Sequence, residues 1–80
     1  MANTFMIEVR FNNRPLYANV YLHTKGQLTY HVNFIGEDLP AFLQDTIILA
    51  YKEEKLEPVK DGIPGVFMKK VIDGIERHVK

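Results

Sequence analysis

The feature that most constrains the fold is the strict alternation of apolar and polar residues between Leu16 and Ile35. Apolar residues occupy every second position in two runs: Leu16, Ala18, Val20 and Leu22, then Leu28, Tyr30, Val32 and Phe34. A period of two is typical of a strand with one buried and one solvated face. The stretch therefore predicts a β-hairpin. Its two strands must share a buried face, because a slip of one residue would turn one strand over.

The turn of this hairpin is predicted at Thr24-Lys25-Gly26. A two-residue loop at Lys25-Gly26 would set apolar residues opposite polar ones and would require positive φ at Lys25. A three-residue loop avoids both problems and puts Gly26 where a left-handed conformation is preferred. The predicted pairs are His23 with Gln27, Leu22 with Leu28, Val20 with Tyr30, and Ala18 with Val32.

Three further stretches have the character of strands. Thr4 to Asn12 alternates in the same way, and we predict that Phe11 pairs with Leu16 across the next turn. The continuous apolar run Thr46–Tyr51 is typical of a buried strand. Lys55–Lys60 is a weaker strand, which Pro58 restricts to a sheet edge, and its place in the sheet stays open.

The C-terminal part predicts one amphipathic helix. After Pro64, apolar residues recur at three- and four-residue spacing and form one stripe: Phe67, Met68, Val71, Ile72, Ile75 and Val79. Gly74 weakens this helix but can let it lie close to a neighbouring element. One helical turn is expected from Pro40 to Gln44, within a connection that carries the apolar residues of Leu39–Leu43.

Together these elements predict a single small α+β domain over residues 1–80. Its core is an antiparallel sheet of four to five strands (β-β-β-β-β-α), with the one C-terminal amphipathic helix packed on one face and the other face partly bare. An 80-residue chain buries only about 60–65% of its unfolded surface, so dimerisation is one way to bury more.

Composition argues against several classes of function. The chain has ten basic and ten acidic residues and no cysteine. Zero net charge gives no bulk attraction to nucleic acid or to an anionic membrane surface. Without cysteine there are no disulfides and no thiolate ligands. No stretch suggests a membrane span or a signal peptide, so we expect a cytoplasmic protein without a cofactor.

The predicted register arranges the bare face in three rows across the first three strands. These rows are Arg10, Tyr17 and Asn33; Glu8, Asn19 and His31; and Met6, Tyr21 and Thr29. A carboxylate and a histidine can form an acid–base site. However, Glu8 and His31 would lie two strands, about 9–10 Å, apart. A solvated sheet face is the simpler interpretation of these rows.

A metal site between His23 and His31 is rejected on distance. The predicted register sets them about 13 Å apart along the strands, whereas shared ligands lie about 2 Å from one ion. No metal site is therefore predicted. His78 is expected to interact, in solvent, with the carbonyl end of the helix.

The bare face also carries apolar residues, which point to a protein interface. Met6, Ile35, Ile48 and Ala50 would join Tyr17 and Tyr21 in a semi-apolar patch, a common mark of a contact site. Either the Leu39–Leu43 segment covers this patch or a second subunit does.

We therefore predict a non-catalytic binding or assembly protein that acts through protein–protein contacts, with another protein or with a second copy in a homodimer. The first alternative is single-stranded nucleic-acid binding through Tyr17, Tyr21, Arg10 and His31. Glu8 on the same face and the neutral charge argue against it. The second alternative is a small enzyme using Glu8 and His31.

Overall fold

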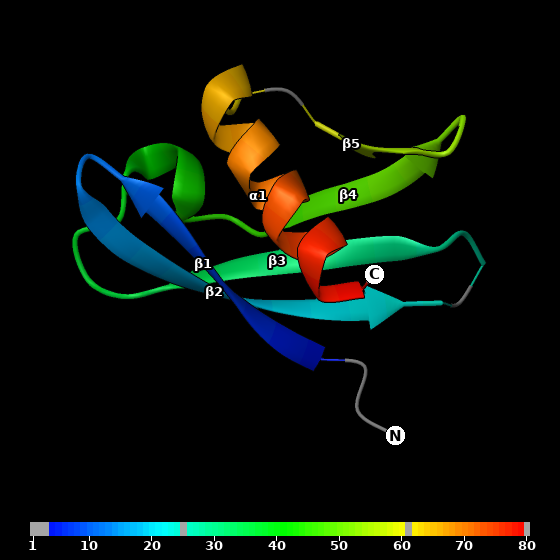
Figure 1. Ribbon diagram of the computed structural model, residues 1–80, viewed down its shortest axis with the longest axis horizontal. Helices are drawn as coiled ribbons and strands as arrows, with labels where there is room; N and C mark the ends of the chain where they lie inside the picture. Colours follow the sequence, from blue (N-terminus) through cyan, green and yellow to red (C-terminus); the bar gives the residue numbers. More distant parts are fainter. Residues whose placement is uncertain (1–3, 25, 61, 80) are drawn as a thin grey trace.

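Five antiparallel strands precede one C-terminal helix in the computed structural model, which describes residues 4–24, 26–60 and 62–79 (Figure 1). The strands are β1 (Thr4–Phe11), β2 (Arg14–His23), β3 (Thr29–Ile35), β4 (Ile47–Lys52) and β5 (Lys55–Pro58). A 3-10 turn, η1 (Ala41–Leu43), joins β3 to β4, and α1 spans Gly65–Val79. The sheet follows chain order, β1-β2-β3-β4-β5. The predicted fold class is confirmed, and β5 takes the edge position beside β4.

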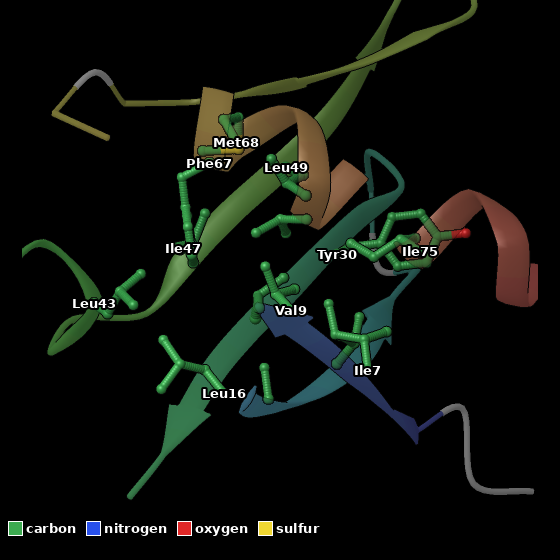
Figure 2. Close-up of a cluster of buried hydrophobic side chains, with 14 of the residues drawn as sticks. Ile7, Val9, Leu16, Tyr30, Leu43, Ile47, Leu49, Phe67, Met68 and Ile75 are labelled. Carbon is green, nitrogen blue, oxygen red and sulfur yellow. The ribbon is translucent and has the colours of Figure 1, made fainter. Parts of the chain in front are cut away.

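The core lies between α1 and one face of the curled sheet. The helix crosses that face and contacts both edge strands, β1 and β5 (Figure 1). Figure 2 shows buried side chains from the strands meeting those of the helix. The helix contributes Phe67, Met68, Val71 and Ile75 to the core. Ile72 and Val79, the other members of the predicted stripe, are half-buried and exposed respectively.

The helix lies close to β1 at Gly74. A Cβ atom placed there would meet Ile7 Cβ at 3.6 Å, which is ordinary van der Waals contact. The expected close approach of α1 to a neighbour is therefore present, and the neighbour is the edge strand β1.

The pairing of β1 with β2 differs from the predicted register by two residues. Phe11 pairs with Arg14 rather than with Leu16. The turn between them is formed by Asn12 and Asn13 alone, with φ values of 52° and 61°. Two positive φ values define the tight turn that suits a hairpin, and Asn accepts this conformation better than most residues. The Asn-Asn pair was the sequence signal for the shorter loop.

The pairing of β2 with β3 is also shifted by two residues. His23 pairs with Thr29 and Val20 with Val32, so the connection runs from residue 24 to residue 28. Gly26 has the expected left-handed conformation, with φ of 82°, while Lys25 lies outside the described residues. The predicted three-residue loop is wrong.

Packing explains this choice of register. A shift by two residues keeps every side chain on its own face, so the alternation cannot distinguish the two pairings. In the observed register the fully buried Ala18 lies between Ile7 and Phe34. The smallest core side chain thus sits between two large ones, as dense packing requires.

The segment around η1 closes one end of the core. Leu43 is buried, and the Phe42 ring lies edge-on to Phe11 and Phe67, with ring centres 5.8 and 5.6 Å apart. The helical turn expected from Pro40 to Gln44 is present as η1 with its flanking caps. Because Phe42 packs on the helix side, this segment leaves the middle of the other face open. In the described part of the chain, no helix is both long enough and apolar enough to cross a membrane.

Candidate functional site

The side of the sheet opposite α1 carries every site residue that the sequence singled out, and we call it the outer face. Its residues on β1 to β4 are Met6, Glu8, Arg10, Tyr17, Asn19, Tyr21, His23, Thr29, His31, Asn33, Ile35, Ile48 and Ala50. They alternate along the strands with the buried core residues, and each of them is exposed or half-buried. The assignment of residues to faces made from the alternation therefore holds.

The rows across the outer face differ from the predicted ones, because both registers are shifted. One row is Glu8, Tyr17 and Ile35, and the next is Met6, Asn19 and Asn33. A third row joins Tyr21 to His31 and His31 to Ile48, and a fourth joins His23 to Thr29 and Thr29 to Ala50. Arg10 lies at the end of the face, opposite Pro15.

Large apolar side chains remain accessible in the middle of the outer face. Met6 is 55% exposed, Ile35 47%, Tyr17 45% and Tyr21 37%. They come from three neighbouring strands, β1, β2 and β3. Ile48 and Ala50 of β4 are half-buried and pair with His31 and Thr29, so the four interface candidates and the two tyrosines lie on the same face of the sheet.

The proposed acid–base pair is not brought together. Glu8 lies in the row of Ile35, whereas His31 is four residues from Ile35 along β3. Two strand spacings and four residues correspond to about 16 Å. We therefore do not propose a site built from Glu8 and His31.

Two histidines that the predicted register separated lie side by side. The His23 and His31 ring centres are 5.4 Å apart, with an angle of 37° between the rings. His31 also stacks on Tyr21, at 5.1 Å and 23°. Thr29 Oγ1 lies 3.2 Å from His31 Nε2, within hydrogen-bond distance. The expected 13 Å separation is wrong because His31 faces Tyr21, two residues from His23, and not Asn19.

His78 lies in the last turn of α1 and is exposed, as the sequence suggested, but it also has an aromatic neighbour. Its ring stacks on Phe5 of β1, with 4.0 Å between ring centres and 9° between planes. This contact lies on the helix side of the sheet, away from the pair formed by His23 and His31.

A strongly perturbed tyrosine belongs to the core rather than to the outer face. Burial, and then the hydrogen bond with Tyr51, raise the pKa of Tyr30 to about 12. Loss of water around the hydroxyl disfavours the charged phenolate. Tyr30 is 5% exposed and faces α1, so this shift bears on stability.

Two hollows border the outer face, and each is lined in part by an interface candidate, Ile48 in the first and Met6 in the second. One, of about 350 Å³, is lined mainly by apolar residues of η1, β4 and the chain after β5, with Asp45 and Lys60 among its polar residues. The other, of about 360 Å³, lies between the edge of β1 and α1 and is lined in part by Glu8 and Arg77. Neither hollow includes His31.

Within residues 4–24, 26–60 and 62–79, no group of three or more His, Cys, Asp or Glu side chains could hold a metal ion. Comparison of the chain with protein-family models, with curated protein sequences and with solved structures gives no match.

Proposed function

We propose that this chain is a non-catalytic binding or assembly protein that acts through protein–protein contacts on the outer face. The observation that carries the proposal is the exposure of Met6, Tyr17, Tyr21 and Ile35 on one side of the sheet. Exposed apolar patches mark interaction sites in soluble proteins. Tyr and Met are also enriched at interfaces, where they supply apolar area.

An 80-residue chain buries only about 60–65% of its unfolded surface, so association is one way to bury more. A second copy of the chain is the simplest partner, because two-fold homodimers are the commonest assemblies.

The location that we propose for this activity is the cytoplasm. The chain has no cysteine, so its stability does not depend on the oxidising conditions in which disulfides form.

The zero net charge of the chain supports a protein partner over a polyanion.

The proposal is tested by adding charge to the outer face. In the double variant Met6→Lys/Ile35→Lys, two solvated ammonium groups would have to be buried in the interface. We expect sedimentation equilibrium to show a dimer for the wild-type chain and a monomer for the variant at the same concentration. Circular dichroism should show the same fold, because both side chains are about half-exposed.

The matched control places the same two charges elsewhere. Val66 on α1 is 76% exposed, and Leu28 in the β2–β3 connection is 38% exposed. The variant Leu28→Lys/Val66→Lys should dimerise like the wild type. A wild-type chain that stays monomeric up to millimolar concentration would contradict self-association.

Single-stranded nucleic-acid binding remains the alternative, because Tyr17 and Tyr21 are exposed on the same face and aromatic rings can stack on bases. The Tyr21 ring already stacks on His31, and Glu8 lies opposite Tyr17, so the face is poorly suited to a polyanion. Titration with mixed oligonucleotides at low salt would shift tyrosine fluorescence if this alternative holds, and would leave it unchanged if the protein-binding proposal holds.

A further inference from the structure

We propose that His23 and His31 form half of a zinc site, which the same two histidines of a second copy complete across the outer face. This inference rests on the proposed self-association through that face and adds the chemistry that would control it. It starts from two metal-ligating side chains that lie side by side on the outer face.

The separation of the two rings suits a shared ion. A zinc–imidazole bond is about 2.0–2.1 Å long, so the centre of each ligating ring lies about 3.2 Å from the metal. Two such rings at the tetrahedral angle have their centres about 5.2 Å apart. The observed separation of 5.4 Å is close to this value.

The orientation of His31 also suits the site. Its Nε2 lies 3.2 Å from Thr29 Oγ1, and Thr29 pairs directly with His23 across the two strands. This nitrogen therefore points toward the row that His23 occupies. Binding an ion there exchanges one neutral hydrogen bond for a metal–nitrogen bond. Stacking on Tyr21 limits the rotation of the His31 ring, so less side-chain freedom is lost on binding.

A second copy is the occupant that completes the coordination. Structural zinc sites have four protein ligands in a tetrahedron, and within the described residues no cluster of three suitable side chains exists on one chain. A two-fold axis through the ion supplies the same two histidines again, because such an interface repeats every residue. Packed sheets lie about 10 Å apart, a gap that imidazoles reaching from both sides can span.

Accessibility agrees with this arrangement. His23 is exposed and His31 is half-buried on the open face. The apolar side chains of Met6, Tyr17 and Ile35 lie on the same face and would be covered in the same dimer.

The test is sedimentation velocity of the full chain without a histidine tag, first in EDTA and then with stepwise addition of zinc sulfate. We expect the dimer fraction to rise with zinc, to saturate at one ion per two chains, and to fall again when EDTA is added. Protons compete with metals for imidazole, so acidification should also dissociate the zinc dimer.

The variants His23→Gln and His31→Gln should each abolish the zinc response. Circular dichroism and urea denaturation of both variants show whether the fold is kept. His78→Gln is the matched control, because His78 stacks on Phe5 on the helix side and its loss should leave the zinc response unchanged.

The remaining outcomes separate this inference from the proposed function. Zinc bound by a monomer, no zinc response, or an equal loss of response in His78→Gln overturns the zinc site. A dimer that is equally stable in EDTA but is lost in Met6→Lys/Ile35→Lys supports outer-face association and overturns the role of zinc. A zinc dimer that tolerates Met6→Lys/Ile35→Lys supports the histidine site and contradicts the apolar patch as the interface.

Discussion

Tyr30 shows how one core residue couples packing to electrostatics. Its ring lies edge-on to Phe5 and to Tyr51, at 6.4 and 6.2 Å between ring centres. The hydroxyl is carried into the core with the ring, because β3 turns this residue toward α1. Burial then favours the neutral phenol over the charged phenolate, which is why the pKa of Tyr30 is raised to about 12.

Alkaline pH should therefore destabilise the fold through Tyr30. In the unfolded chain the pKa of Tyr30 is near its ordinary value of 10.0, and in the folded chain it is about 12. The unfolded state loses its proton first, so the stabilisation is complete below about pH 10 and is lost as the pH rises toward about 12. The loss can be measured by urea denaturation as a function of pH.

The matched variants for this prediction are Tyr30→Phe and Tyr17→Phe. Tyr30→Phe removes the ionisable group and should flatten the alkaline decline, although loss of the hydrogen bond with Tyr51 lowers stability at neutral pH by about 1 kcal/mol. Tyr17→Phe changes an exposed residue of the outer face and should retain the decline. An unchanged alkaline profile in Tyr30→Phe would assign the decline to another group.

Among the elements, two tight turns share the same backbone conformation, but only one of them has residues that suit it. Asn12-Asn13 and Glu53-Glu54 each connect paired strands with two residues at positive φ, 52° and 61° in the first turn and 52° and 69° in the second. Asn tolerates this conformation, whereas a longer side chain costs roughly 1–2 kcal/mol per residue there. The turn between β4 and β5 is therefore strained, and the five-strand sheet compensates for that strain.

Replacing the strained turn should stabilise the fold. The variant Glu53→Asn/Glu54→Gly provides the residue pair preferred in such turns and should raise the free energy of unfolding by about 1–2 kcal/mol. Urea denaturation measures the change. Glu53→Gln/Glu54→Gln, which removes the same charges without relieving the backbone, should give little of the gain. Equal gains in both variants would assign the effect to charge.

For the whole molecule, the edges of the sheet are less suited to association than its outer face. The edge strand β5 has four residues and ends at Pro58, and short edges with proline resist pairing. At the other edge, Lys70 Nζ donates a hydrogen bond to the Arg10 carbonyl of β1, and a lysine at an edge has the same effect. The outer face keeps large exposed apolar side chains, which favours it as the contact surface.

A dimer formed through this face should make stability depend on concentration. Association that involves only the folded state raises the thermal midpoint by mass action, so the wild-type midpoint should increase with chain concentration. Met6→Lys/Ile35→Lys should remove that dependence and leave the midpoint near that of the dilute wild type. Differential scanning fluorimetry over a hundredfold concentration range measures both. A concentration-independent wild-type midpoint would show that the chain folds without a partner.

The sequence by itself determined the elements and their faces. Alternation in β1 to β3 separated core residues from outer-face residues. The apolar stripe located α1, and Gly26 marked the connection between β2 and β3. Each of these signals is local, because it depends on the period of a strand or helix and on the backbone freedom of one residue.

Only the tertiary structure decided the registers, and with them the candidate site. Alternation is unchanged by a shift of two residues, so it could not choose between pairing Ala18 with Val32 and pairing it with Phe34. Dense packing of Ala18 between Ile7 and Phe34 in the core made that choice. Relative to the predicted register, the same shift places His31 beside His23 and away from the row of Glu8. The sequence therefore predicted the outer face but not the histidine pair on it.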